Sequence, residues 1–183
     1  MRILTVPGMG SDGRMSTDLA GAALRALGHE VLDIDQPIRR AWNVRWHLQA
    51  DAADITAVAT DGDVVLAHSY GCLKAAEANK TVRFAAMFLY RPAMSRNYTF
   101  PSHRTTRVYC MYSPQDWLIL LGAMLRFNHP FGAAGRSGFT DLAVRNVRVH
   151  GGHSHDFTKD HVVEQALFVH NEMQTMGRTQ GSQ

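Results

Sequence analysis

The sequence predicts an α/β protein in which a six-stranded parallel sheet is covered by helices on both faces. Short apolar runs of strand length alternate with longer segments of helical spacing along the 183 residues. Many of the apolar runs end at a turn or at a residue that stops a strand, as at Pro7-Gly8 and Arg91-Pro92. Strands that are separated by helices form parallel sheets, and such sheets are buried on both faces.

The predicted strands are short and mostly apolar. They cover residues 3–6, 30–34, 64–67, 84–90, 107–112 and 143–149. In the last strand, Val144 and Val147 are three positions apart, so they cannot share a face of the sheet without a bulge.

The predicted helices lie between these strands, where apolar residues recur every three or four positions. They cover residues 15–27, 44–59, 70–80 and 159–176. Gly28 follows the first helix and is typical of a helix C-terminus. Residues 177–183 are polar and are predicted to form a frayed tail. The sequence has no repeat and no linker, so we expect one domain over residues 1–176.

Composition argues against several classes of protein. The apolar run at the start is too short for a signal peptide, and no stretch has the length of a membrane-spanning helix. Cys72 and Cys110 are too few for a disulfide framework, and no Cys or His spacing indicates a metal site. We therefore expect a soluble, cytoplasmic protein without a membrane span.

The net charge of +3 comes from basic residues that are scattered along the chain. Their densest group is Arg39, Arg40 and Arg45. A mild excess of positive charge is typical of an ordinary solvated surface. Binding of nucleic acid or of an acidic ligand through these arginines stays a minor alternative, which strong salt dependence would favour.

The segment that indicates chemistry is DVVLAHSYGCLKA, residues 63–75. A four-residue apolar strand leads directly into Ser69, and a helix follows at once. A serine in so sharp a turn presents its hydroxyl above the sheet, and Ala67 and Gly71 are small enough for strand and helix to pack closely. The helix N-terminus also offers free N–H groups to a developing oxyanion. The alternative is a serine that only caps the helix.

This segment resembles the nucleophile elbow of the α/β-hydrolase family, G-x-S-x-G, with Ala67 in place of the first glycine. The resemblance implies that Ser69 is a nucleophile and that the Tyr70 N–H is one donor of an oxyanion hole. It also places an acid and then a histidine on loops after later strands. With right-handed crossovers, it implies the strand order 2-1-3-4-5-6, with the strand before Ser69 near the centre.

An acid follows the strand at 107–112, where the chain turns through Ser113-Pro114-Gln115 into Asp116. The resemblance implies that Asp116 is the acid of a catalytic triad. As an alternative, Asp116 caps a helix that begins at Trp117. Asp141 is the rival acid, but it precedes the last strand and so lies at the other end of the sheet.

A glycine-rich loop with three histidines follows the last strand: His150, His153 and His155. His153 comes after two glycines and best matches the position of the family's catalytic histidine. His155, next to the final helix, is the first alternative. His150, at the strand end, is the second.

The loop after the first strand, Pro7-Gly8-Met9-Gly10, is similar to the family's oxyanion loop, which implies that the Met9 N–H is the second oxyanion donor. A dinucleotide-binding loop is a competing interpretation of these glycines. It is weak, because no acidic residue stands in clean register after the second strand, where Asp33 and Asp35 are the candidates.

The resemblance implies a serine hydrolase that cleaves a carboxylester or thioester of a small acyl substrate through an acyl-enzyme, with no cofactor and no metal. An amidase or an acyltransferase on the same triad, and an inactive hydrolase-fold binding protein, are the alternatives. Residues 91–106 are too few for a cap domain. Residues 117–140 are more numerous, but they more often form an outer helix than a lid, so we expect a compact, uncapped hydrolase.

Overall fold

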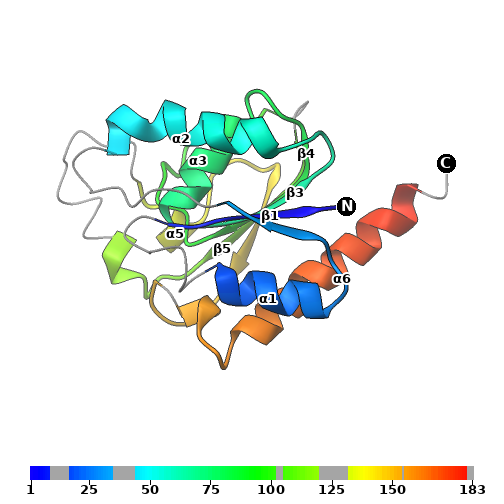
Figure 1. Ribbon diagram of the computed structural model, residues 1–183. Coiled ribbons are helices and arrows are strands. Elements are labelled where there is room, and N and C mark those ends of the chain that lie inside the picture. The colour runs from blue at the N-terminus through cyan, green and yellow to red at the C-terminus, as the bar shows by residue number, and fades with distance from the viewer. Residues whose placement is uncertain (9–16, 35–43, 102–104, 120–131, 154, 181–183) are drawn as a thin grey trace.

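A computed structural model describes residues 1–8, 17–34, 44–101, 105–119, 132–153 and 155–180. Six parallel strands form one sheet in the order β2-β1-β3-β4-β5-β6 (Figure 1). The strands are β1 (Ile3–Val6), β2 (Val31–Asp33), β3 (Val64–His68), β4 (Phe84–Tyr90), β5 (Thr105–Tyr112) and β6 (Val144–Arg148). The predicted sheet and its strand order are confirmed.

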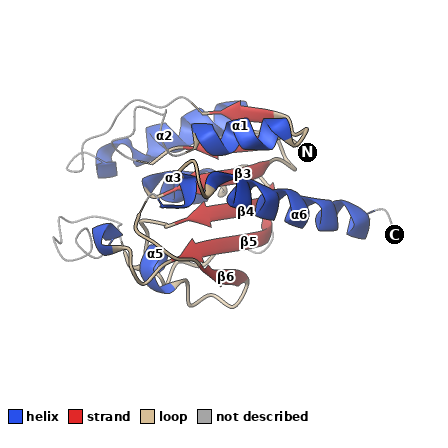
Figure 2. Cartoon of the chain, turned by 90° about the horizontal axis from the view of Figure 1, so that it is seen from below, coloured by secondary structure: helices blue, strands red, loops and turns tan. Residues whose placement is uncertain are grey.

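Helices cover both faces of this sheet, and the two figures agree on their arrangement (Figures 1 and 2). One face carries α2 (Val44–Val58) and α3 (Tyr70–Ala78), which contact each other, together with the short α5 (Ala134–Ser137). The other face carries α1 (Asp18–Ala26) and α6 (Val162–Gln180), which also pack together. A one-turn 3-10 helix, η2 (His155–Phe157), precedes α6.

The alternation of side chains along each strand builds two separate cores. In β3, Val65 and Ala67 pack on the side of α2 and α3, whereas Val64 and Leu66 pack on the side of α1 and α6. All five residues of β3 are buried, as expected for a central strand of a parallel sheet. The strand that leads to Ser69 is therefore held from both faces.

The last strand is regular. Its register with β5 runs without interruption from Val144 to Arg148. Val144 packs into the core beside α2 and α3, while Val147 packs against the opposite core. The two valines thus lie on different faces, and no bulge is needed.

The last helix differs from its prediction at both ends. It begins at Val162 rather than at residue 159, and it continues to Gln180, four residues beyond the predicted end at Met176. Gly177 does not stop it, and the end of the helix projects beyond the sheet (Figure 2). A polar sequence is compatible with helix where the helix runs on into solvent, so polarity alone did not mark the end.

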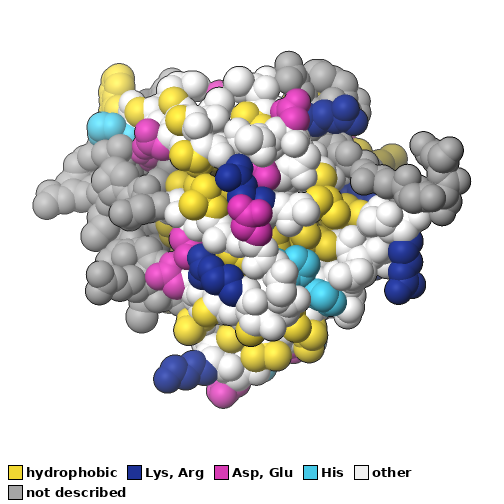
Figure 3. All heavy atoms as spheres, turned by 45° about the vertical axis from the view of Figure 1, so that its right-hand side comes forward, with side chains coloured by type: hydrophobic (Ala, Val, Ile, Leu, Met, Phe, Trp, Pro, Cys, Tyr) yellow, Lys and Arg dark blue, Asp and Glu magenta, His cyan; other side chains and the backbone are white. Residues whose placement is uncertain are grey.

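Charges of both signs lie side by side on the face shown in Figure 3. Arg2 pairs with Asp63 at 2.6 Å, and Arg25 pairs with Asp33. Arg39 and Arg40 lie outside the described residues, as does the side chain of Arg45. In the part of the chain that the structure describes, no helix combines the length and apolar character that crossing a bilayer requires.

Candidate active site

The strand–helix junction at Ser69 has the geometry of a strained elbow. Ser69 lies between β3 and α3 with φ 56° and ψ −120°, in a region that side-chain-bearing residues rarely occupy. The close approach that the sequence predicts is present, because a Cβ on Gly71 would lie 2.6 Å from the Pro7 carbonyl oxygen. The Ser69 side chain makes no capping hydrogen bond to α3, so helix capping does not account for this serine.

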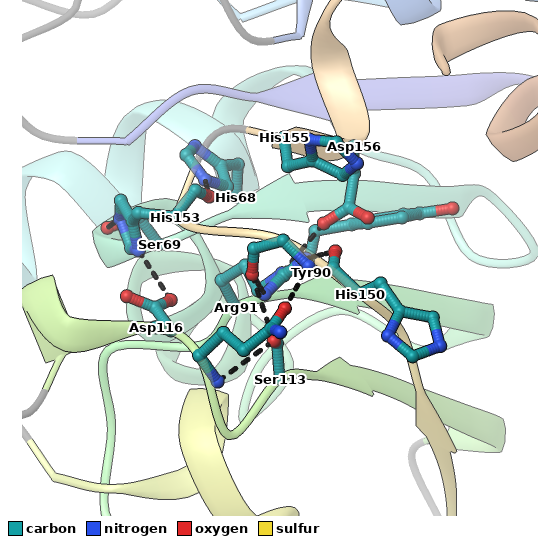
Figure 4. Close-up of polar contacts among 12 residues, drawn as sticks. His68, Ser69, Tyr90, Arg91, Ser113, Asp116, His150, His153, His155 and Asp156 are labelled. Atoms are coloured by element: carbon teal, nitrogen blue, oxygen red, sulfur yellow. Dashed lines mark hydrogen bonds and ion pairs between the residues drawn. The ribbon is translucent and has the colours of Figure 1, made fainter.

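Ser69, His153 and Asp116 form a continuous chain of hydrogen bonds (Figure 4). The distance from Ser69 Oγ to His153 Nε2 is 2.8 Å, and that from His153 Nδ1 to Asp116 Oδ2 is 2.7 Å. An ionised carboxylate can only accept, so His153 Nδ1–H donates to Asp116 and leaves Nε2 to accept from the Ser69 hydroxyl. The three side chains come from the ends of β3, β5 and β6, where the sequence places them.

Asp116 uses its second oxygen for the following helical turn. Its Oδ1 accepts a hydrogen bond from the Ile119 N–H at 3.2 Å, while Oδ2 accepts from His153. The Asp116 carboxylate is fully buried. The Asp116 side chain therefore makes both kinds of contact that the sequence left open, one with a histidine and one with the N–H of a following helical turn.

His68, directly before Ser69, lies against His153. The two imidazole rings are 4.8 Å apart, and His68 Nε2 lies 2.9 Å from the His153 backbone oxygen. A carbonyl oxygen accepts, so His68 Nε2–H is the donor of this bond. Burial, and then the neighbouring His153, lower the pKa of His68 to about 3, so its ring stays neutral at ordinary pH.

The loop that carries His153 is held by a buried ion pair. Arg91, directly after β4, is fully buried, and its Nε donates to Asp156 Oδ2 at 2.7 Å. The other two guanidinium nitrogens donate to the carbonyl oxygens of His150 and Gly151, at 2.7 and 2.8 Å. Figure 4 shows this group beside Ser69, His153 and Asp116.

The same loop is also joined to the segment before Asp116. Ser113 Oγ donates to the Gly151 carbonyl at 2.9 Å, and the Gly151 N–H donates to Gln115 Oε1 at 2.6 Å. Gly151 has φ 86°, and a Cβ there would overlap the His155 ring. Only glycine fits this point without strain.

The alternative residues lie elsewhere. His150 is exposed, and its backbone oxygen accepts from Arg91. The His155 ring lies 4.0 Å from the His161 ring, with the two ring planes inclined by 40°. Asp141 accepts from the Ala143 N–H at 2.9 Å and from the Phe100 N–H at 3.2 Å, so its carboxylate serves the turn before β6.

The resemblance implies two backbone donors, the N–H groups of Tyr70 and Met9, and only Tyr70 is among the described residues. Tyr70 opens α3 directly after Ser69, so its N–H belongs to the first turn of that helix. Met9 lies outside the described residues. Its neighbour Gly8 is close to the elbow, because a Cβ on Gly8 would lie 3.0 Å from Ser69 Cβ. The described start of the loop after β1 therefore lies against Ser69.

A surface cavity of about 470 Å³ lies between α2 and α3, near the end of α3 that is remote from Ser69. Its lining residues are Gln49, Ala52, Ala53, Thr56, Ala57, Glu77, Ala78, Lys80 and Thr81. None of them belongs to the hydrogen-bond chain, so chemistry rather than cavity size locates the candidate site. Among the described residues, no three His, Cys, Asp or Glu side chains are grouped as a metal ion would require.

No pattern in the sequence indicated a role for His68 or Arg91. Arg91 looks like a residue that stops a strand, because a charged side chain at a strand end is usually exposed. His68 occupies a variable position of the elbow pattern. The burial of both depends on how the 150–156 loop folds over the strand ends, and no spacing in the sequence encodes that.

Comparison with known proteins identifies the fold. No family model and no curated protein matches the sequence. Among solved structures, mouse alpha/beta hydrolase domain-containing protein 10 is similar at a TM-score of 0.63 and 14% identity, over 96% of this chain and 90% of that one. The ydeN gene product of B. subtilis is similar at 0.60 and 15% identity, over 97% and 98% of the two chains.

A pyrethroid hydrolase from Sphingobium faniae JZ-2 is similar at a TM-score of 0.60 and 11% identity, over 93% of this chain and 96% of that one. The three similarities extend over nearly the whole length of both partners in each pair. Together with the strand order and the helices on both faces, they establish that this chain has the α/β-hydrolase fold.

Proposed function

We propose that the protein is a serine hydrolase that cleaves a carboxylester or thioester, with Ser69, His153 and Asp116 as its catalytic triad. The observation that carries this proposal is the hydrogen-bond chain from Ser69 Oγ through the His153 imidazole to Asp116, with distances of 2.8 and 2.7 Å. A hydroxyl within reach of a base that a carboxylate orients is the arrangement of an activated nucleophile.

Ser69 Oγ attacks the substrate carbonyl carbon while His153 Nε2 takes the hydroxyl proton. Asp116 keeps the Nδ1–H directed toward itself and stabilises the positive charge that forms on the imidazole. The tetrahedral intermediate collapses with loss of an alcohol or thiol, which leaves with the proton that Nε2 held. Water then attacks the acyl-enzyme by the same route, and the acid product leaves Ser69 free again.

The oxyanion faces the N-terminus of α3. The Tyr70 N–H is the proposed first donor, at a helix end whose N–H groups and dipole favour negative charge. The closeness of Gly8 to Ser69 supports the loop after β1 as the source of the second donor, which we assign to the Met9 N–H. No step of this reaction needs a metal or an organic cofactor.

The surroundings of Asp116 support an apolar acyl substrate. Trp117 and Leu118 follow the buried carboxylate, and 64% and 43% of their surfaces are exposed. Large apolar side chains that stay exposed next in the chain to a proposed catalytic residue are candidates for contact with an apolar ligand. Two of these structural neighbours, the mouse protein and the Sphingobium faniae enzyme, are named as hydrolases, which agrees with the proposed class of reaction.

The first prediction is covalent labelling by a fluorophosphonate at Ser69. Mass spectrometry of the labelled wild-type protein should locate the adduct there, and Ser69→Ala should abolish both the label and ester hydrolysis, with a loss on the order of 10⁶-fold in kcat. Ser137→Ala is the matched control, because the Ser137 hydroxyl, in α5, donates to the carbonyl of Ala133, which precedes that helix. A label on another residue would refute Ser69 as the nucleophile, and no label on folded protein would favour a binding protein.

A further inference from the structure

Arg91 has an unusual backbone conformation that it shares with the proposed nucleophile. Ser69 and Arg91, with φ values of 56° and 49°, are the two non-glycine residues with positive φ among those described. They follow the ends of the adjacent strands β3 and β4. Conformations of this kind are costly for residues with a side chain and persist where surrounding contacts enforce them.

The backbone around Arg91 is bonded to Ser69 on both sides. The Ser69 N–H donates to the Tyr90 carbonyl at 2.9 Å, and the Ala93 N–H donates to the Ser69 carbonyl at 3.1 Å. Arg91 itself is joined to β5, because its N–H donates to the Met111 carbonyl at 2.9 Å. The turn that contains Arg91 therefore cannot move without moving the elbow.

The side chain of Arg91 reaches the loop that carries His153 and contacts it on both sides of the histidine. The guanidinium donates to the carbonyls of His150 and Gly151 before it, and to the carboxylate of Asp156 after it. The Arg91 side chain is fully buried and that of Asp156 is 3% exposed. The positive charge is thus compensated inside the protein.

We infer that Arg91 is a positioning residue that fixes the distance between Ser69 and His153. Its backbone turn is tied to the nucleophile, and its guanidinium is tied to the loop of the base. This inference rests on the proposed function, since the distance matters only if Ser69 and His153 act together. Arg91 touches neither member of the pair with its side chain, so it acts through the loop.

Stability alone does not explain the choice of an arginine here. Burying an ion pair costs desolvation energy, and an apolar pair of similar volume is often equally stable. The planar guanidinium, however, donates in several fixed directions. It can therefore reach three separate acceptors, the two backbone carbonyls and the Asp156 carboxylate. A lysine keeps the charge but offers its donors from a single point. Arg91→Lys therefore removes the geometry and keeps the charge.

The test compares Arg91→Lys with Arg2→Lys, both assayed on an activated ester at a temperature where circular dichroism shows them folded. Arg2 pairs with Asp63 at 2.6 Å, directly before β1 and β3. This pair therefore lies at the N-terminal ends of the strands, whereas Ser69 lies at the C-terminal end of β3. Arg91→Lys should lower kcat on the order of 10²-fold with KM within about threefold, because the reacting groups are misplaced rather than the substrate lost. Arg2→Lys should lose stability but keep kcat.

A second readout does not depend on activity. NMR of the His153 imidazole nitrogens should report the hydrogen bond at Nε2 in the wild-type protein and its loss in Arg91→Lys. If the wild-type protein is neither active nor labelled by a fluorophosphonate, the proposed function fails, and this spectrum alone decides whether Arg91 positions the ring. Unchanged kcat and unchanged imidazole signals in folded Arg91→Lys would overturn the inference and leave the triad standing.

Asp156→Asn provides the test if Arg91→Lys does not fold. The amide keeps an oxygen for Arg91 Nε and removes the charge that holds the guanidinium. We expect a smaller loss of kcat, about tenfold, with KM again nearly constant and a changed signal for His153 Nε2. A variant that loses only thermal stability, with kcat of the folded protein intact, would show that the Arg91–Asp156 pair is merely structural.

Discussion

At the scale of single residues, the site depends on side chains that make two different contacts at once. Asp116 accepts from His153 with one carboxylate oxygen and from the Ile119 N–H with the other. His68 lies against the His153 ring and donates to its backbone oxygen. Each contact removes a degree of freedom from His153, so the imidazole has few orientations available. This is the preorganisation that general-base catalysis needs.

The second prediction separates the histidines of the 150–155 loop. His153→Ala should lose nearly as much ester hydrolysis as Ser69→Ala, and the double variant should be little worse, because residues that act as a unit are not additive. His150→Ala and His155→Ala should keep most activity, since their rings lie away from Ser69. Asp116→Asn should lose about 10⁴-fold in kcat through the wrong imidazole tautomer.

Steady-state kinetics on an activated ester measures all of these variants. Activity that survives in His153→Ala but not in His155→Ala would identify His155, rather than His153, as the general base.

The sequence predicted Ser69, Asp116 and His153 because each follows a recognisable strand, and the ends of parallel strands meet at one edge of the sheet. It did not predict Arg91, because burial of a charge depends on partners that are distant in the chain: Asp156 is 65 positions away. The same holds for His68, whose hydrogen-bond partner is 85 positions away. Local patterns encode strands and turns, but they do not encode which loops fold over them.

At the scale of elements, the close contact between β1 and α3 sets the shape of the elbow. A Cβ on Gly71, in the first turn of α3, would lie 2.6 Å from the Pro7 carbonyl oxygen, just after β1. The obstacle is backbone rather than a flexible side chain, so it cannot turn aside. A side chain at this position must push the helix away from the strand, and Ser69 lies at the junction between them.

The third prediction is that Gly71→Ala both destabilises the protein and reduces activity. We expect a loss of about 3 kcal/mol in the free energy of unfolding, as for overpacked sites, measured by urea denaturation. Gly177→Ala is the control, because outside its chain neighbours and the adjacent backbone of α6 no atom lies within 4 Å of its added Cβ. That change should stabilise by about 0.5–1 kcal/mol through helix propensity. Wild-type stability and activity in Gly71→Ala would show that β1 and α3 can separate freely.

The strands were easier to predict from the sequence than the ends of the helices. Strand ends coincide with strong signals such as Arg91-Pro92 after β4. The end of α6 has no such signal, since Gly177 sits in the helix without steric need and polar residues continue beyond it. The sequence did not show which face of the sheet each side chain of β6 occupies. In the structure, Val144 packs into the core beside α2 and α3, and Val147 packs against the opposite core.

At the scale of the whole molecule, the fold holds His68 neutral inside the protein. Burial and the nearby His153 lower the pKa of His68 to about 3, from the ordinary histidine value of about 6.5. The unfolded chain therefore binds this proton more readily than the folded protein between those two pH values. Because stability falls as pH falls wherever the unfolded state binds more protons, the neutral His68 contributes to acid sensitivity in this window.

The fourth prediction concerns that sensitivity. Protonation of His68 in the unfolded chain should by itself lower the free energy of unfolding by an amount on the order of 5 kcal/mol as the pH falls from 6.5 to 3. In His68→Gln, which keeps an N–H donor for the His153 carbonyl, the dependence of stability on pH should be shallower over this range. His47→Gln in α2 is the control and should follow the wild-type curve. Urea denaturation at a series of pH values measures the slopes, and parallel curves for all three proteins would disprove the assignment.

The proposed site lies at the C-terminal ends of the strands, and this has a practical consequence for attaching the protein to a solid support. The proposed chemistry occupies the edge where the strands end, whereas Leu142 lies in the turn that enters β6 and is fully exposed. The native thiols Cys72 and Cys110 are buried, and burial raises the pKa of both. A cysteine introduced at position 142 would thus be the thiol that a maleimide resin captures, and the immobilised molecule would present its opposite edge to the solution.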